Sequence, residues 1–375
     1  MPASPRFAIG LISGTSIDGI DCALVDLSGS APRLVEASCT PYASALRTEL
    51  LALCAQPQIS LEKFGSLHIQ VGRAFAVCVN DMLTRTGIQR SEISVIGSHG
   101  QTVFHQPDSA TPFSLQIGDA NTIAQLTGLT TVADLRGRDM AAGGQGAPIA
   151  PLLHRHCFAS AEQTRMIVNV GGIANLTALP ANGSARAFDT GPANVLMDYW
   201  IAKHKGETFD ADGAWAASGK VSPALFRKLL AEPYLTLPAP KSTGRELFNG
   251  AWLEERLEQV EATSGNRIAA QDVQATLLEL SCASIANAVH SQAESGALYL
   301  CGGGAHNAAL RQRLSQLAPN FTVETTSALG MDPDWVEAIA FAWMAQQRLE
   351  GTALDTQAFT GASQPVVLGG IYSGA

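Results

Sequence analysis

The chain has 375 residues, and its 24 basic and 33 acidic side chains give a formal net charge of −9 at pH 7. Hydrophobic residues make up 46% and charged residues 15%, which excludes a disordered chain and predicts two or three globular domains. The acidic balance argues against nucleic acid or an anionic membrane as a partner, but backbone amides can still bind a phosphorylated ligand.

Seven cysteines are scattered along the chain, and no two have CxxC spacing. This pattern predicts free thiols in a reducing compartment and argues against a structural zinc site. The sequence shows no charged-then-apolar leader and no run of 18 apolar residues. We therefore expect a cytoplasmic α/β protein without a membrane span.

The first elements predict a β-hairpin with a long polar turn. An apolar strand over 7–12 is followed by a turn-rich loop over 13–19 and a second strand over 20–27. No helix fits between the two strands, so this is not the strand–loop–helix of a P-loop. Apolar residues at three- and four-residue steps then predict a long helix over 60–86, ended by Gly87.

The middle of the chain predicts a strand over 93–97, a helix from Asp119 to Gly128 and a strand over 130–133. The loop over 135–148 is too rich in glycine for a helix. We expect a domain boundary near this loop, with an N-terminal domain over 1–134 and a C-terminal domain over 135–375.

The second half repeats the opening pattern. A strand over 166–170, a Gly171-Gly172 turn and a strand over 176–179 predict another hairpin, and a helix follows Asn194. Long helices are expected over 272–293 and 333–350, and the latter could pack back on the first domain. Two halves that each begin with a hairpin predict a duplicated α/β architecture.

Three glycine-containing turns directly follow apolar strands, at 14–19, at 171–172 and at 302–304. Successive amides in such turns can bind one anion, and Asp18 or Asp21 beside a phosphate would imply a bridging Mg²⁺. The alternative is that these are ordinary turns. Neither a P-loop motif nor a G-x-G-x-x-G fingerprint occurs. A nucleotide held by one hairpin from each of two duplicated domains is the pattern of the actin/hexokinase/Hsp70 superfamily.

Asp189 is the candidate general base, because phosphoryl transfer to a hydroxyl needs a carboxylate that orients or accepts the proton. It stands in Phe188-Asp189-Thr190-Gly191-Pro192, at a strand end before a helix. The alternative is a helix-capping aspartate. An aspartic-protease site needs a second Asp-Thr/Ser-Gly triplet, and the chain has none.

Other groups carry weaker signals. His99 with His105, and His154 with His156, could suggest a metal site, but capping or packing roles are the simpler interpretation. No G-x-S-x-G elbow indicates a serine hydrolase. Glu337, one turn into the last helix, either complements the helix dipole or faces a cleft.

Six blocks in order resemble the anhydro-N-acetylmuramic acid kinase family. They are SGTSIDGID (13–21), GSHGQT (97–102), DLRGRD (134–139), GGQGAP (143–148), NVGGIAN (169–175) and FDTGPAN (188–194). The resemblance is dense from 7 to about 200, and it resumes at 301–307 and in the last helix. Ile17 and Ala193 depart mildly from the pattern, and residues 205–270 carry no motif that we can assign.

The resemblance implies two ribonuclease H-like domains with an interdomain ATP cleft. It also implies a bacterial enzyme of peptidoglycan recycling that uses ATP, Mg²⁺ and water to convert 1,6-anhydro-N-acetylmuramic acid to N-acetylmuramic acid 6-phosphate and ADP. A homodimer is expected from the resemblance alone.

The resemblance and the motifs together define the expected site. Asp189 is the catalytic base, and Asp18 holds Mg²⁺ through water. The residues expected to bind ATP are Gly14, Thr15, Ser16, Ile17, Asp18, Gly19, Ile20, Asp21, Gly171, Gly172, Asn175, Gly302, Gly303, Gly304 and Asn307. The residues expected to bind the sugar are Arg138, Arg136, His99, Gln101 and Glu337. Three alternatives stay open: a simple sugar hydroxyl kinase, a non-catalytic nucleotide-dependent binding protein, and a protein that binds no nucleotide.

Overall fold

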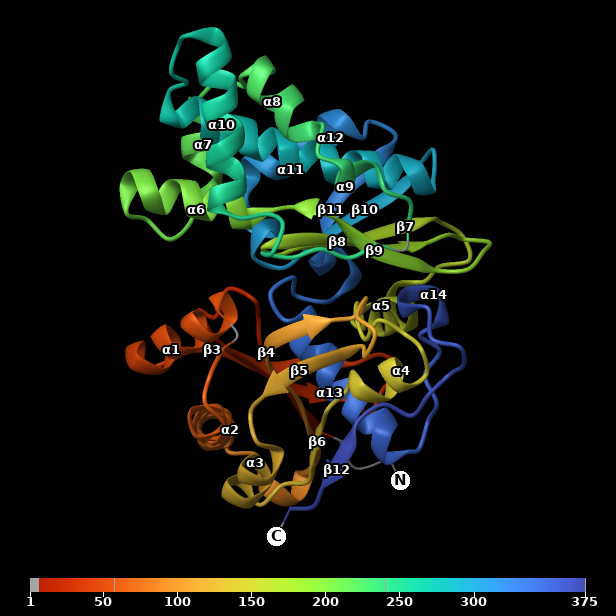
Figure 1. Ribbon diagram of the computed structural model, residues 1–375. Helices are drawn as coiled ribbons and strands as arrows, with labels where there is room; N and C mark the ends of the chain where they lie inside the picture. Colours follow the sequence, from red (N-terminus) through yellow and green to blue (C-terminus); the bar gives the residue numbers. More distant parts are fainter. Residues whose placement is uncertain (1–6, 57, 240, 375) are drawn as a thin grey trace. The chain divides into compact units, whose positions relative to one another are not determined.

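A computed structural model describes residues 7–56, 58–239 and 241–374 (Figure 1). The chain forms two compact units. Unit 1 comprises Met1–Cys157 and Trp335–Ala375, and unit 2 comprises Phe158–Asp334. The C-terminal segment thus returns to the unit in which the chain begins.

Unit 1 is built on a mixed sheet with the strand order β12-β6-β4-β1-β2-β3, and β5 also pairs with β4. Its first three strands are antiparallel neighbours, whereas β4 is parallel to β1 and β6 is parallel to β4. The strands are β1 (Phe7–Ser13), β2 (Gly19–Asp26), β3 (Arg33–Pro41), β4 (Ile93–Gln106), β5 (Phe113–Ile117), β6 (Thr131–Ala133) and β12 (Gly370–Tyr372).

Two long helices of this unit pack on its sheet. The full set of helices is α1 (Ser44–Ala55), α2 (Leu61–Thr86), η1 (Arg90–Glu92), α3 (Ala120–Thr127), α4 (Gly137–Ala141), α5 (Pro151–Phe158), α13 (Val336–Leu349) and α14 (Gln357–Thr360). α2 contributes Leu67, Val71 and Phe75 to a core shared with β1 and β2. α13 packs on β1 and β4, and it approaches so closely that a Cβ at Gly10 or Gly97 would collide with its backbone.

Unit 2 has a five-stranded sheet with the order β11-β10-β7-β8-β9. The strands are β7 (Arg165–Val170), β8 (Ile173–Leu179), β9 (Arg186–Pro192), β10 (Gly296–Cys301) and β11 (Phe321–Thr325). The helices are α6 (Asn194–Lys205), η2 (Ala211–Gly213), α7 (Ala214–Ser218), α8 (Pro223–Leu230), α9 (Pro233–Thr236), α10 (Gly250–Ser264), α11 (Ala270–Gln292), η3 (Gly303–His306), α12 (Ala308–Leu317) and η4 (Thr326–Leu329). α11 is buried along most of its length and forms the centre of this unit's core.

The two sheets share a core of five strands. In each, three consecutive strands form an antiparallel meander, and two further parallel strands, β4 and β6 in unit 1 and β10 and β11 in unit 2, lie on the side of the first strand. Unit 1 adds β5 and β12, which pair antiparallel with β4 and β6. The repeated core confirms the predicted duplicated α/β architecture of the actin/hexokinase-like, ribonuclease H-like type.

Most of the long predicted helices and both hairpins occur where the sequence placed them. Ser60 accepts a hydrogen bond from Lys63 at the start of α2, and Gly87 ends that helix in the left-handed conformation. The expectation that 135–148 contains no helix is wrong, because α4 forms there. Its Asp139 is buried and accepts hydrogen bonds from Gly146 and from Thr360.

These bonds also explain where the units divide. Arg136 donates to His99 on β4, and Asp139 is tied to Thr360 near the C-terminus. The segment 135–157 is therefore part of unit 1, although the sequence placed the boundary at 134/135. Within the described residues, no helix has both the length and the apolar character needed to cross a bilayer.

Candidate active site

The loop between β1 and β2 combines one buried apolar side chain with several exposed polar ones. Ile17 is fully buried although its φ is +54°, and its amide donates to the carbonyl of Gly14. Burial of this side chain holds the loop in a conformation that β-branched residues rarely adopt. Thr15, Ser16 and Asp18 are consequently exposed around it.

Hydrogen bonds from Gln101 and Arg47 also hold this loop in place. The buried amide of Gln101 accepts from the Ser13 hydroxyl at 2.5 Å and donates to the carbonyl of Gly14 at 3.3 Å. Arg47 donates to the carbonyl of Ile17 at 2.7 Å. Gln101 was expected to bind the sugar, but it is completely buried and supports the loop instead.

The glycines of this loop differ in what surrounds them. A Cβ added at Gly14 would meet only the Ser16 hydroxyl, 3.8 Å away, whereas one at Gly19 would press on Cys39 and Thr40. Gly14 is therefore open to a ligand, and Gly19 is required by packing. Ile20 is buried like Ile17, so either residue can offer a ligand only its backbone.

Two acidic side chains accompany the loop. Asp18 is exposed and accepts a hydrogen bond from Ser16 at 2.8 Å, and Asp21 is half-buried and paired with Cys39 on β3. A carboxylate in this setting suits Mg²⁺, which binds proteins through one or two carboxylates and keeps its waters and phosphate ligands. Within the described residues, no group of three or more His, Cys, Asp or Glu could hold a metal by itself.

His99 and Arg136, both expected to bind the sugar, contact each other. Nε of Arg136 donates to Nε2 of His99 at 3.0 Å, and Nδ1 of the same ring donates to the carbonyl of Gly100 at 3.1 Å. Arginine only donates and a carbonyl only accepts, so His99 is neutral with its proton on Nδ1. Burial and the Arg136 charge hold the pKa of His99 well below its usual range.

Arg138 differs from Arg136. Arg136 also donates to the carbonyl of Gly146 at 2.9 Å, so its guanidinium is built into the fold. Arg138 is exposed on α4, and among the described residues its side chain makes no hydrogen bond or ion pair. Glu337 is half-buried in the first turn of α13. Arg138 is therefore the better placed of the two arginines to bind an anionic ligand.

In unit 2, two predicted site residues lie side by side on neighbouring strands. Asn175 on β8 is paired directly with Asp189 on β9, and residues paired in this way direct their side chains to the same face of the sheet. The pairing shifts beside them, so that Thr190 is an extra residue in β9. Such a bulge bends the strand and redirects the neighbouring side chains.

The Gly171-Gly172 turn lies between β7 and β8. Its carbonyls accept hydrogen bonds from the first amides of α6, at Ala193, Asn194 and Val195. A Cβ at Gly171 would contact only a carbonyl oxygen 3.5 Å away, so the turn is open on its outer side. Ala193 has a φ of −116°, so this position does not need the positive φ that glycine provides.

The three-glycine turn packs against the end of β7. A Cβ at Gly302 would collide with Asn169, and one at Gly304 with Val170, whereas Gly303 has nothing within 4 Å. Asn307 is nearly buried and caps α12 by accepting from Leu310 at 3.0 Å. Of the three glycines in this turn, only Gly303 has free space where a Cβ would lie.

A pocket of about 410 Å³ lies beside the start of α12. Its walls are mostly apolar and come from α7, α11 and α12, with Glu279 and Arg313 at its charged end. Ala309, two residues after Asn307, is one of the lining residues. The open Gly303 and this pocket thus belong to neighbouring parts of unit 2.

The sequence did not identify the residues that contact Asp189. The amide of Thr243 donates to its Oδ2 at 3.0 Å, and the Tyr234 hydroxyl donates to its backbone carbonyl at 2.9 Å. The amide of Asp189 donates to the carbonyl of Lys241 at 3.0 Å. These residues lie about 50 positions beyond Asp189, in the segment without an assignable motif, so no local signal could have found them.

Two duplicated α/β units, each with an open glycine hairpin at the end of its first strand, and a carboxylate beside the second hairpin define a kinase of the actin/hexokinase-like class. The family model for anhydro-N-acetylmuramic acid kinase matches residues 6–374. The chain belongs to this family.

Similar proteins agree with this assignment. "Anhydro-N-acetylmuramic acid kinase" of Shewanella baltica (strain OS223) is 49% identical over 368 residues, covering 98% of both chains. The protein of the same name from Shewanella loihica is 48% identical over 372 residues, covering 99% of this chain and all of that one. A solved structure, the activator of the 2-hydroxyisocaproyl-CoA dehydratase from Clostridium difficile, aligns at 11% identity with a TM-score of 0.47, over 92% of this chain and 96% of that chain. That likeness is too low to bear on function.

Proposed function

We propose that the chain converts 1,6-anhydro-N-acetylmuramic acid, ATP and water to N-acetylmuramic acid 6-phosphate and ADP, as a step in the recycling of peptidoglycan. Its membership of the kinase family over nearly the whole chain supports the overall reaction. The observation that carries the mechanism is Asp189, held by Thr243 at a strand bulge beside Asn175 and the Gly171-Gly172 turn.

Asp189 acts as the general base in this proposal. Its carboxylate accepts a proton from a water molecule that attacks the anomeric carbon C1 of the sugar. The C1–O6 bond breaks, and its electron pair goes to O6. O6 then attacks the γ-phosphorus of ATP, and ADP leaves. The new C1 hydroxyl comes from water, the phosphate of the product comes from ATP, and one proton is released overall.

The glycine turns hold the nucleotide. Gly14, Thr15, Ser16 and the backbone amides as far as Asp21 contact the phosphates from unit 1, because this loop is open and offers several donors. Gly171, Gly172 and Asn175 supply further contacts from unit 2. Gly303 and the pocket beside α12 contact the adenosine. Asp18 would hold Mg²⁺ through water, and the ion would neutralise phosphate charge when bound.

Arg138 binds the lactyl carboxylate of the sugar, and Glu337 accepts a hydrogen bond from a sugar hydroxyl. Arginine suits the carboxylate because its planar guanidinium can donate two parallel hydrogen bonds. His99, Arg136 and Gln101 support these groups rather than contact the sugar. Their buried hydrogen bonds to one another and to the loop favour this assignment.

The enzyme acts in the cytoplasm, where ATP is available, and it acts as a homodimer. The homodimer rests on family resemblance alone. Sedimentation equilibrium tests it, and a monomer at micromolar concentration would contradict it.

The reaction is tested by comparing acceptors. The protein is incubated with ATP, Mg²⁺ and either the anhydrosugar, N-acetylmuramic acid with its ring already opened, or glucose, and ADP and sugar phosphate are measured. We expect rapid 6-phosphate formation from the anhydrosugar. Faster phosphorylation of the opened sugar would instead identify a simple hydroxyl kinase. ADP formation without any sugar product would identify a nucleotide hydrolase.

A further inference from the structure

Tyr234, Lys241 and Thr243, which follow α8 in the sequence, hold both the backbone and the side chain of Asp189. Tyr234 and Thr243 lie at the two ends of this contact, and each donates one hydrogen bond to Asp189. Lys241 accepts from the Asp189 amide through its own carbonyl. Three hydrogen bonds thus join one aspartate to one segment that is remote in sequence.

The side chain of Lys241 closes this segment on itself. Its Nζ donates to the carbonyl of Tyr234 at 3.1 Å and to that of Leu235 at 3.3 Å. The same ammonium lies over the Tyr234 ring, 4.7 Å from its centroid. Lys241 therefore couples the residue that holds the Asp189 carbonyl to the loop that holds the Asp189 carboxylate.

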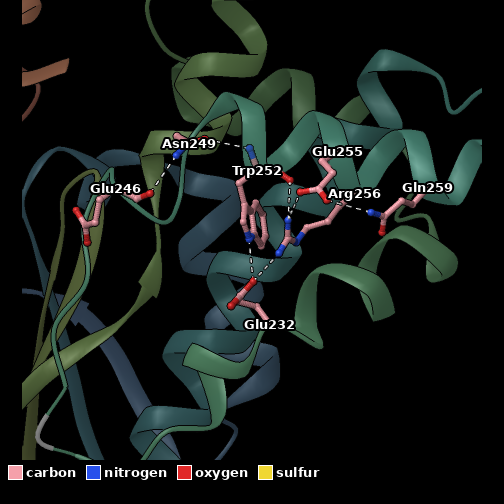
Figure 2. A network of polar contacts seen from close by, with 7 residues as sticks. All are labelled: Glu232, Glu246, Asn249, Trp252, Glu255, Arg256 and Gln259. Carbon is pink, nitrogen blue, oxygen red and sulfur yellow. Dashed lines mark hydrogen bonds and ion pairs between the residues drawn. The ribbon is translucent and has the colours of Figure 1, made fainter. Parts of the chain in front are cut away.

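The beginning of α9 is anchored independently. Oε2 of Glu232, a nearly buried side chain, accepts from Nε1 of Trp252 and from Nη2 of Arg256, each at 2.8 Å (Figure 2). The Arg256 guanidinium also lies over the Trp252 ring, 4.4 Å from its centroid. Because Glu232 directly precedes α9, these contacts fix Tyr234 relative to α10.

Lys241 and Tyr234 both interact electrostatically with Asp189, and Glu246 also acts on Tyr234. β8 supplies the neutral Asn175, and α11 approaches β9 at Ser284. Burial lowers the pKa of Lys241, and the Asp189 charge opposes this shift. Burial raises the pKa of Tyr234, as do Asp189 and Glu246, so its hydroxyl stays a donor.

We propose that Lys241 is a positioning residue for Asp189, which it orients through the Tyr234–Thr243 segment and keeps ionised through its positive charge. This inference rests on the proposed role of Asp189 as the base. The proposed reaction needs an ionised Asp189, because a neutral carboxyl cannot accept the proton of the attacking water. The Lys241 ammonium interacts electrostatically with Asp189, and an opposite charge favours the ionised form of a carboxyl.

The test is the pH dependence of kcat for Lys241→Met and Lys241→Arg. We expect Lys241→Met to lower kcat at pH 7 about tenfold and to move the acid limb of the profile up by about one pH unit, with little change in the KM for ATP. Lys241→Arg keeps the charge and should restore both. The matched control is Lys228→Met, since Lys228 is exposed and, in the described part of the chain, its side chain makes no hydrogen bond or ion pair.

Two results would overturn the proposal. One is a Lys241→Met enzyme whose acid limb stays in place, whether or not kcat falls, because a purely structural defect lowers the active fraction at every pH. The other is failure of Lys241→Arg to restore the profile. If Lys241→Met does not fold, Lys241→Gln takes its place, because it keeps a donor for the α9 carbonyls and removes the charge. The pH profile of kcat for Lys241→Gln then tests the proposal. Asp189→Asn separates the hypothesis that Asp189 is the base from the hypothesis that Lys241 positions it. Near-normal turnover in Asp189→Asn would refute the role of Asp189 itself.

Discussion

The two units use the same five-stranded core to place different chemistry at the same edge of the sheet. In each, one row of paired residues crosses the three meander strands near the end of the first strand. The row is Ile12, Asp21 and Cys39 in unit 1, and Asn169, Asn175 and Asp189 in unit 2. Unit 1 thus has its carboxylate on the second strand, beside the polar loop, and unit 2 has it on the third strand.

The turns of the two hairpins also differ in the polar side chains that they carry. Unit 1 has a long loop with exposed hydroxyls and the Asp18 carboxylate, whereas unit 2 has only the backbone of Gly171-Gly172. The surroundings of the third strand differ as well, because Thr243 and Tyr234 hold Asp189 in unit 2. Each copy of the duplicated sheet therefore carries an open glycine turn, but the carboxylates lie on different strands in the two copies.

The largest expected effect on kcat comes from substitution of Asp189, on the third strand of unit 2. We expect Asp189→Asn to lower kcat by about 10²–10⁴, the usual range for loss of a general base, with unchanged ATP affinity by calorimetry. Cys39→Ser changes the corresponding residue of unit 1 and should keep kcat within about twofold of wild type. Turnover of Asp189→Asn within tenfold of wild type would refute the assignment.

The hairpin turns come next. Gly14→Val should abolish measurable ATP binding, because its new side chain has room in the fold but would fill the approach to the loop amides. Gly171→Val, in the shorter turn of unit 2, should weaken binding about tenfold. Gly29→Val is the control, since a Cβ there meets only one carbonyl oxygen, 3.6 Å away. Normal ATP affinity in Gly14→Val would contradict the placement of the phosphates.

Substitutions of Arg138 and Arg136 should separate an effect on sugar binding from an effect on stability. Arg138→Ala should raise the KM for the anhydrosugar about tenfold, as expected for one lost charged hydrogen bond, and leave the free energy of unfolding within about 0.5 kcal/mol. Arg136→Ala leaves His99 and the Gly146 carbonyl without their donor and should cost about 1–3 kcal/mol of stability. The reverse pattern, measured by urea unfolding and kinetics, would show that the roles are exchanged.

The smallest effect is a pH dependence of stability in unit 1. Burial lowers the pKa of His154 to about 3, so below pH 6.5 the unfolded chain binds a proton that the folded chain does not. The free energy of unfolding should therefore fall with decreasing pH, by up to about 1.4 kcal/mol per pH unit for this histidine. His154→Gln should reduce the slope of stability against pH between 6 and 4. An unchanged slope would show that His154 is protonated in the folded state.

Local patterns predicted the elements that local interactions specify. The end of α2 at Gly87 follows from a left-handed glycine. Asp189 was expected at a strand end before a helix, and it lies within β9, three residues before the end of that strand. The supporting roles of Gln101 and Asn307 could not be predicted, because an amide that binds a ligand and an amide that holds a loop look alike in sequence. Lys241 was missed because its contact with Asp189 depends on the tertiary path of a segment without regular spacing.

The central claim is that water attacks the sugar and O6 receives the phosphate. The most direct measurement is to run the reaction with ATP, Mg²⁺ and the anhydrosugar in ¹⁸O-water and to analyse the products by mass spectrometry. Unlabelled product held in ¹⁸O-water for the same time corrects for exchange at C1. The account predicts a sugar 6-phosphate with one ¹⁸O at C1 and none in its phosphate group. A sugar phosphate without ¹⁸O at C1, or ¹⁸O appearing in inorganic phosphate, would contradict it.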